Sequence, residues 1–247
     1  MKIIGFSGGQ GSGKSSITFL LNHILNKYTP FKSLVLSIDD YYLSIKKREI
    51  LAKEVHPLCL TRGVPGTHNI TKLIETISTL SNNSSNSAIP IPSFSKLSDD
   101  YFPKNNWRVY RYKPDIIFVE GWCIGASPIG DEDWLPPLNY LEKEFDPKAI
   151  WGKWSNEMLR MEYQKLFKLI DLLIMIRLPS MSDVFKSRWK QELTLKKLNS
   201  NKDTLSRNKV NEFVMHFERL TRHMLKTLPP SADIIIERDI EFNYSIK

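Results

Sequence analysis

Cysteine is scarce in this chain, which has only Cys59 and Cys123 among its 247 residues. Each stands beside an apolar or aromatic neighbour, so we expect two buried, reduced thiols rather than a disulfide or a zinc site. Long apolar runs are also lacking, since none approaches the roughly eighteen residues that a membrane span needs. The first expected strand begins at Lys2 and leaves no room for a signal peptide. These absences predict a soluble, cytoplasmic protein with no membrane partner.

The chain also lacks an acidic surplus. It has 35 Lys and Arg residues and 27 Asp and Glu residues, which gives a net charge of +8. This balance suits anionic partners. The basic residues are scattered, however, and we expect the densest cluster, at 46–48, to be a solvated helix face rather than a nucleic-acid patch. With 41% hydrophobic and 25% charged residues the composition is that of a globular protein, and a single domain over 1–247 is expected. The oligomeric state stays open.

A phosphate-binding motif stands near the N-terminus. Residues 8–15 read Gly-Gly-Gln-Gly-Ser-Gly-Lys-Ser and match G-x-x-x-x-G-K-S between an apolar run and a helix-period stretch, which disfavours a plain Gly/Ser turn. Glycines let consecutive N–H groups face an anion, and the dipole of the next helix points at the same place. Lys14 is expected to reach the β- and γ-phosphates, and Ser15 to coordinate Mg²⁺. The expected nucleotide-binding residues are Gly8, Gly9, Gln10, Gly11, Ser12, Gly13, Lys14, Ser15 and Ser16.

Short apolar runs alternate with helix-period stretches along the chain. The runs cover 2–7, 33–38, 115–119, 171–178 and 233–236. Helices are predicted over 15–26, 70–80, 154–170, 182–198 and 210–225, the first with a buried stripe of Ile17, Leu20, Leu21, Ile24 and Leu25. A polar loop is expected at 81–87 and a turn at 202–207. This alternation predicts an α/β fold with a mostly parallel sheet that helices cover on both faces.

Acidic residues follow two of the expected strands. Asp39 and Asp40 close the second apolar run, and Glu120 closes the third. Ligands of open parallel sheets bind outside the carboxyl ends of the strands, where a carboxylate can take a hydroxyl proton or hold a metal ion. The alternative roles are a helix cap and a turn, but the coincidence with the phosphate motif favours chemistry. A GTPase is disfavoured, because 201–204 read Asn-Lys-Asp-Thr, one residue shorter than Asn-Lys-x-Asp.

Six stretches resemble one family of P-loop kinases. They read GGQGSGKSS from Gly8, SIDDYYL from Ser37, TRGVPGTHN from Thr61, VEGWCIG from Val119, SRWKQE from Ser187 and FVMHFERLTRHML from Phe213. Together they make the chain similar to the D-glycerate 3-kinase family, within the group that includes phosphoribulokinase, uridine kinase and pantothenate kinase. The resemblance implies a three-layer P-loop NTPase fold with a helical lid at about residues 182–206.

The resemblance also implies roles for individual residues. Asp39 matches the residue that activates the acceptor hydroxyl, and Glu120 matches the acidic Walker B residue. These two carboxylates and Ser15 are the implied ligands of Mg²⁺. Lys14 and Arg188 complete the implied catalytic set, Arg188 by stabilising charge on the transferring phosphoryl group. The implied acceptor-binding residues are Tyr41, Arg62, Thr67, His68 and Lys96.

The implied activity is an ATP- and Mg²⁺-dependent kinase for a hydroxyl of a small, anionic metabolite, with D-glycerate as the first candidate. One loop departs from the family, which usually has arginines and an aspartate where this chain has Ser93, Ser95 and Tyr101. Serine and tyrosine cannot replace the bidentate contacts of arginine, so a nucleoside or a pantothenate-like acid stays open as acceptor. An ATP-binding regulator without an acceptor also stays open. A nucleic-acid-binding NTPase rests on the net charge alone.

Overall fold

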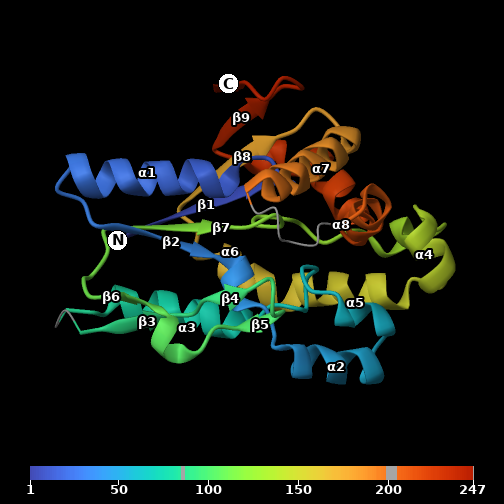
Figure 1. Cartoon of the computed structure of the whole chain (residues 1–247), viewed down its shortest axis with the longest axis horizontal. Coiled ribbons are helices and arrows are strands. Elements are labelled where there is room, and N and C mark those ends of the chain that lie inside the picture. The colour runs from blue at the N-terminus through green and yellow to red at the C-terminus, as the bar shows by residue number, and fades with distance from the viewer. Residues whose placement is uncertain (85–86, 199–204, 247) are drawn as a thin grey trace.

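A six-stranded sheet forms the centre of the protein in a computed structural model that describes residues 1–84, 87–198 and 205–246. The five predicted apolar runs are strands β1 (Lys2–Gly8), β2 (Ser33–Ser37), β7 (Ile116–Glu120), β8 (Leu172–Arg177) and β9 (Ile234–Arg238), and β10 (Tyr244–Ile246) is the sixth strand. The strand order is β10-β9-β8-β1-β7-β2, and β10 is the antiparallel member. The predicted α/β fold with a mostly parallel sheet is confirmed (Figure 1).

Successive residues of each strand pack on opposite faces of the sheet, because strand side chains point to the two faces in turn. On β1, Ile4 and Phe6 face helix α1 (Lys14–Tyr28), whereas Ile3 belongs to a larger core on the other face. Phe6 also meets Phe118 of β7 edge to face, with 5.9 Å between the ring centroids. The apolar runs are therefore buried on both sides, as expected of parallel strands.

Helix α1 forms as predicted, but its buried stripe is narrower than its apolar spacing indicates. Ile17, Leu21 and Leu25 pack on the sheet. Leu20 is 56% exposed and Ile24 is 40% exposed, so the prediction that these two residues are buried is wrong. The reason is geometric: a helix lying on a sheet turns one side toward it, and these two side chains lie on the outer side.

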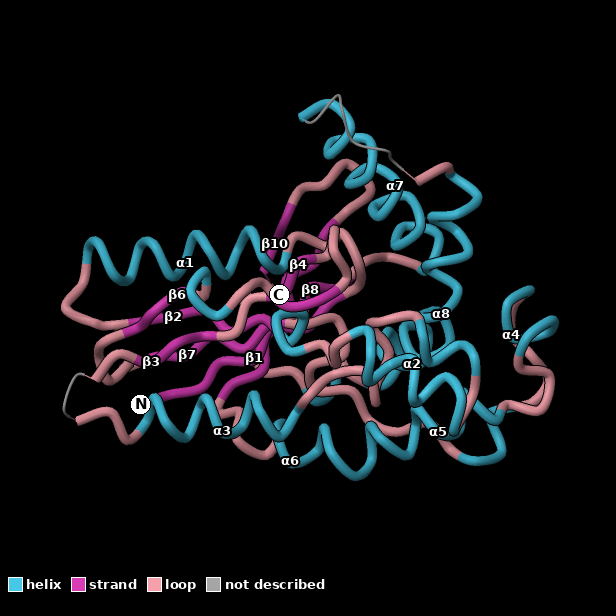
Figure 2. Tube along the Cα trace, turned by 60° about the horizontal axis from the view of Figure 1, so that its bottom comes forward, coloured by secondary structure: helices cyan, strands magenta, loops and turns pink. Residues whose placement is uncertain are grey.

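Helices on the opposite face of the sheet bury the larger core. They are α3 (Ile70–Ser81), α5 (Ile150–Met158), α6 (Gln164–Phe167) and α8 (Arg207–Thr227). Leu73 and Ile77 of α3 and Phe217 of α8 are buried, as their helical spacing predicts. Figure 2 shows α3 and α6 on one side of the strands and α1 on the other. The predicted covering of both faces by helices is confirmed.

The predicted helix over 154–170 is interrupted: α5 ends at Met158, a π-helical turn (Leu159–Tyr163) follows, and α6 continues the segment. The remaining helices are α2 (Ile45–Glu54), α4 (Tyr140–Phe145) and α7 (Met181–Leu198). Single 3-10 turns cover Ile38–Tyr41, Pro57–Leu60, Lys104–Asn106, Asp131–Trp134 and Pro229–Ser231. Helix α7 matches the predicted helix over 182–198. Residues 202–204 of the turn expected at 202–207, and the tetrapeptide 201–204, lie outside the described residues, and Arg207 begins α8.

Two small hairpins occupy the long excursion between β2 and β7, and the sequence did not predict them. Strand β3 (Ile89–Ile91) pairs with β6 (Arg108–Tyr110), and β4 (Phe94–Ser95) pairs with β5 (Asp100–Tyr101), both antiparallel. Strands this short show too little alternation of apolar and polar residues to be recognised. The polar loop predicted at 81–87 precedes them, and its residues 85 and 86 lie outside the described part of the chain.

Arg48 of α2 is buried, which corrects the prediction that 46–48 form a solvated helix face; the two lysines are exposed as expected. The Arg48 side chain is 1% exposed and pairs with the carboxylate of Asp99 at 2.9 Å. It also donates to the carbonyl oxygens of Leu43, Leu60 and Asp99. A guanidinium is tolerated inside a protein when its donors are paired in this way. Arg48 therefore ties α2 to the β4–β5 hairpin.

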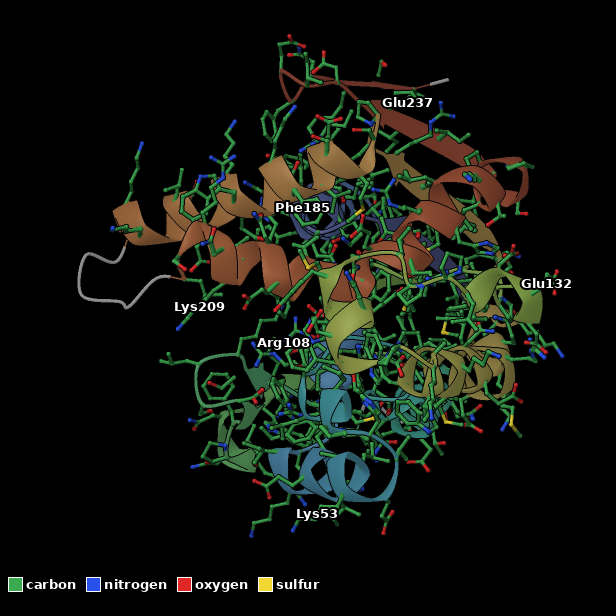
Figure 3. All side chains as sticks on the ribbon, turned by 90° about the vertical axis from the view of Figure 1, so that its right-hand side faces the viewer. Lys53, Arg108, Glu132, Phe185, Lys209 and Glu237 are labelled. Carbon is green, nitrogen blue, oxygen red and sulfur yellow. The ribbon has the colours of Figure 1, made fainter. Side chains whose placement is uncertain are left out.

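Side chains fill the spaces between these layers (Figure 3). Phe185 of α7 is half-buried against α8, whereas Lys53 of α2 extends from the edge of the protein. Both cysteines are buried and free, as predicted. Within the described residues, no helix is both long enough and apolar enough to cross a bilayer.

Candidate active site

The loop between β1 and α1 has the geometry of an anion cradle. Gly11 and Gly13 adopt φ values of +71° and +96°, and a Cβ at Gly11 would lie 2.8 Å from the backbone of Ser187. Both positions therefore favour glycine. Helix α1 begins at Lys14, and no side chain of the described residues caps its N-terminus, so its first N–H groups remain available. The loop offers the backbone donors and the helix dipole that bind phosphate.

Lys14 lies folded over this loop. Its ammonium donates to the carbonyl oxygens of Gly8 at 2.7 Å and Gly9 at 3.0 Å, and the residue is 9% exposed. Burial lowers the pKa of Lys14, while the carboxylates of Glu120 and Asp39 act in the opposite direction. A phosphate oxygen would be a stronger partner than either carbonyl, because charge-assisted hydrogen bonds exceed those to neutral acceptors.

Glu120 ends β7 beside Ser15. The Ser15 hydroxyl donates to Glu120 Oε1 at 3.0 Å, and Glu120 is buried. Burial raises the pKa of Glu120, and Lys14 opposes this rise. Hydroxyl and carboxylate oxygens are the ligands that Mg²⁺ prefers, and a divalent cation would compensate a buried carboxylate. Ser15 and Glu120 therefore fit a phosphate-bound Mg²⁺, and Asp39 is close enough to influence Glu120.

Asp39 follows β2 and holds two partners. Its Oδ1 accepts a hydrogen bond from the Tyr42 hydroxyl at 2.7 Å, and its Oδ2 pairs with the Lys96 ammonium at 2.5 Å. Burial alone would raise the pKa of Asp39, but the Lys96 charge and the bonds from Lys96 and Tyr42 hold it well below its usual range. The side chain is still 30% exposed. Asp39 is thus an ionised carboxylate that a ligand can reach.

Strand order brings the catalytic segments together. Strand β7 lies between β1 and β2, with Glu120 opposite Phe6 on one side and opposite Ser37 on the other. The segments that follow three parallel neighbours leave the sheet at the same edge. Lys14, Glu120 and Asp39 therefore become neighbours, and each influences the others electrostatically. Asp40 points elsewhere: its carboxylate accepts from the Phe94 N–H of the β4 hairpin at 3.2 Å.

Three predicted acceptor-binding residues, Arg62, His68 and Lys96, lie around Asp39. Arg62 lies 5.9 Å from the Tyr42 ring and donates to the Lys96 carbonyl oxygen at 3.2 Å. The His68 ring stacks on the same Tyr42 ring, with 4.6 Å between the ring centroids. The sequence did not single out Tyr42, although the motif SIDDYYL contains it. The structure thus places two cations and two rings beside Asp39, and Arg62 is itself paired with Asp99.

The other two predicted acceptor residues do not face a ligand, which corrects both predictions of direct contact. Tyr41 is fully buried in the large core, because the 3-10 turn Ile38–Tyr41 directs it inward and leaves Tyr42 beside Asp39. Thr67 is also fully buried. Its hydroxyl accepts from the Gly63 N–H and donates to the Val64 carbonyl oxygen, both at 2.8 Å. The Thr67 side chain therefore stabilises the loop at residues 61–69 by hydrogen bonds to its backbone.

Arg188 of α7 contacts neither Lys14 nor the two carboxylates within the described structure. Its guanidinium pairs with Glu192, one helical turn later, at 2.8 Å and lies 5.8 Å from the ring of Phe213 in α8. The preceding residue, Ser187, packs directly on the phosphate loop at Gly11. Helix α7 therefore borders the cradle. Residues 199–204 of the predicted lid lie outside the described residues.

Side chains of the C-terminal strands β9 and β10 donate hydrogen bonds to the phosphate loop. The sequence did not predict these contacts. Arg238 of β9 is 2% exposed and donates to the Gly11 carbonyl oxygen at 3.2 Å and to Ser187 Oγ at 2.6 Å. Tyr244 of β10 donates to the carbonyl oxygen of Ser12 at 3.0 Å. The sequence feature that could have indicated this contact is an arginine at the end of an apolar strand. These bonds connect the loop to helix α7.

No family model matches the chain. It is 30% identical over 226 residues to an uncharacterized kinase, mug58, of Schizosaccharomyces pombe, an alignment that covers 87% of this chain and 78% of the relative. It is 27% identical over 233 residues to the chloroplastic D-glycerate 3-kinase of Arabidopsis thaliana and covers 92% of this chain. The chain spans 48% of the length of that relative. A solved D-glycerate 3-kinase of Cryptococcus neoformans var. grubii shares the fold, with a TM-score of 0.79 at 20% identity over 100% of this chain and 89% of the other.

Proposed function

Because this chain belongs to the P-loop kinase family that includes relatives named D-glycerate 3-kinase, we propose that it transfers the γ-phosphate of ATP to a hydroxyl of a small, anionic metabolite. D-glycerate is the first candidate acceptor. The observation that carries the proposal is the grouping of Lys14, Glu120 and Asp39 at one edge of the sheet, with Asp39 open to a ligand. The small-molecule kinase class follows from the family, whereas the acceptor is part of the proposal.

The residues divide the work of phosphoryl transfer between binding and proton acceptance. The loop amides and Lys14 would bind the phosphates, and Ser15 with Glu120 would hold Mg²⁺. When bound, Mg²⁺ neutralises charge on the phosphate oxygens. Asp39 accepts the proton of the attacking hydroxyl, which requires the Lys96 ammonium to move from it. Arg188 adds positive charge once α7 closes and the pair with Glu192 opens.

The cations beside Asp39 support an anionic acceptor. An acceptor carboxylate would attract the Lys96 ammonium and thereby free Asp39 for the hydroxyl of the same molecule. The residues that depart from the family lie on the hairpin that carries Lys96, where Ser95 is buried and Tyr101 is half-buried. Arg62 is already paired with Asp99, so the charge argument rests on Lys96. A hydroxy acid suits the site better than a neutral nucleoside, because its carboxylate could take over the Lys96 ammonium from Asp39.

We extend the proposal to the whole chain as one kinase domain over residues 1–247, with the lid at about 182–206. A cytoplasmic location remains a prediction from the sequence. The activity of the longer Arabidopsis protein is not transferred as a whole, because this chain spans 48% of it. Neither a nucleic acid nor a membrane is needed as a partner for this chemistry.

A panel of acceptors tests the proposal. Purified protein is supplied with ATP and Mg²⁺ and with D-glycerate, pantothenate or uridine, and ADP release is measured. We expect D-glycerate to raise the rate at least about tenfold above the acceptor-free rate, a barrier difference of about 1.4 kcal/mol. A larger response to pantothenate or uridine would reassign the acceptor. ATP binding without a response to any acceptor would contradict the kinase and favour the regulator.

A further inference from the structure

A buried hydroxyl lies beneath the loop at residues 61–69, which carries Arg62 and His68. Tyr163 ends the π-helical turn Leu159–Tyr163, and its side chain is fully buried under residues 61–69. Its oxygen accepts a hydrogen bond from the Gly66 N–H at 3.1 Å. The same oxygen lies 2.5 Å from Nδ1 of the His68 ring. π-helical turns are rare and occur frequently at functional sites.

Counting protons decides which ring nitrogen of His68 carries hydrogen. A phenol oxygen has two lone pairs and one proton. The Gly66 N–H occupies one lone pair of Tyr163, and within the described residues Nδ1 of His68 is the one acceptor in reach of the hydroxyl proton. Burial raises the pKa of Tyr163 well above its ordinary value, so the proton stays on the phenol. That proton can only be donated to Nδ1 of His68, and the hydrogen of a neutral His68 ring therefore sits on Nε2.

The Nε2 side of His68 has no protein partner within the described residues, and the atom is buried. The ring stacks on Tyr42, whose hydroxyl bonds to Asp39. Burial lowers the pKa of His68 to about 4, and the charges that act on the ring are those of Asp39 and Lys96. The imidazole is therefore neutral at pH 7. A buried N–H without a partner is costly, and a ligand oxygen would remove that cost.

We propose that Tyr163 is a positioning residue that holds His68 as an uncharged Nε2–H donor for an oxygen of the acceptor. The assignment of the ligand as the acceptor rests on the proposed kinase function. The charges of Asp39 and Lys96 both act on the His68 ring, so the ring borders the space beside Asp39. A neutral donor binds a hydroxyl or carboxylate oxygen without competing with Lys96 for the Asp39 carboxylate.

Nuclear magnetic resonance tests the tautomer without any acceptor. Protein labelled with ¹⁵N-histidine is studied by two-bond ¹H–¹⁵N correlation at pH 7, and His68 is assigned by its loss in His68→Gln. We expect hydrogen on Nε2 in the native protein and a mixture of tautomers in Tyr163→Phe. Tyr110→Phe is the matched control, because the Tyr110 hydroxyl on strand β6 is buried and has no hydrogen-bond partner among the described residues. Hydrogen on Nδ1 in the native protein, or an unchanged tautomer in Tyr163→Phe, would overturn the proposal.

Kinetics with the best acceptor of the panel test the contact itself. We expect Tyr163→Phe and His68→Leu to raise the KM for the acceptor by about tenfold and to leave the KM for ATP within about twofold. His68→Gln keeps an uncharged N–H donor and should stay within about threefold of the native KM. Equal losses in His68→Gln and His68→Leu would remove the donor role. If no acceptor responds, the kinase proposal fails. The tautomer experiment needs no acceptor, so it still tests whether Tyr163 holds His68 with its hydrogen on Nε2.

Discussion

Replacing Asp39 with asparagine separates catalysis from binding and stability. Asparagine has the same shape and can still accept the Tyr42 hydrogen bond on its oxygen, but it cannot take a proton. General-base catalysis contributes typically about 10²- to 10⁴-fold, which corresponds to about 3–5 kcal/mol. We therefore expect kcat for Asp39→Asn to fall by that factor. ATP affinity should stay close to native, because the phosphate contacts come from the loop and Lys14.

The cost of this substitution to folding should be small. The ion pair that it removes is exposed on both sides, with 61% of the Lys96 side chain and 30% of the Asp39 side chain accessible to solvent. Exposed pairs contribute about 0–1 kcal/mol, since solvent and salt screen them. A kinetic loss of several kcal/mol beside a stability loss under about 1 kcal/mol would locate the defect in the chemistry.

Asp40→Asn is the matched control. Its carboxylate bonds to the Phe94 N–H and lies 3.9 Å from Arg108, so it supports the hairpin rather than the reaction. ADP release with the active acceptor, calorimetric ATP binding and urea unfolding are measured for both variants. An Asp39→Asn protein with kcat within threefold of native, or an Asp40→Asn protein with an equal loss, would refute the assignment of Asp39 as the proton acceptor.

Three further predictions concern binding, stability and pH. Lys14→Met should weaken ATP binding at least about tenfold in calorimetry, because it removes the charged contact to phosphate; native affinity would exclude Lys14 from that role. Arg48→Met should lower the free energy of unfolding in urea by about 3 kcal/mol, since it leaves the carbonyl oxygens of Leu43, Leu60 and Asp99 without their donor and removes one of the two arginines that pair with Asp99; a change under about 1 kcal/mol would contradict it. The pKa of His68 is about 4 in the folded state and 6.5 ordinarily, so between these values the unfolded chain binds more protons and stability falls as the pH decreases. The native protein should lose about 2 kcal/mol more than His68→Gln between pH 7 and pH 5 in urea unfolding, and equal losses would refute the shift.

Periodicity located the strands and long helices but not everything that covers them. Helix α8 keeps the apolar face that its spacing predicts. On α1, Leu20 and Ile24 continue the same spacing yet are exposed, because spacing tells which side chains share a side of a helix and not how wide a neighbouring surface is. The β3–β6 and β4–β5 hairpins were missed because their strands are too short for a pattern.

Charged and aromatic residues were harder to place than apolar ones. Arg48 looked like part of a solvated cluster and is buried, whereas Arg188 looked like a phosphate ligand and is paired with Glu192. Tyr41 was preferred to Tyr42, and the 3-10 turn reverses that choice. A charge or ring in a sequence carries no record of its partners, which come from segments elsewhere in the chain.

The phosphate cradle could be derived from the sequence alone, because strand, glycine turn and helix start are contiguous and their geometry follows from local backbone preferences. The order of the strands, decided by long-range pairing, places Asp39 and Glu120 beside it. Only the tertiary structure brings three further side chains close to Asp39, namely those of Lys96, Arg62 and His68. It also places the Tyr163 hydroxyl next to the His68 ring. Those contacts join residues distant in the chain, and packing selects them where no local rule can.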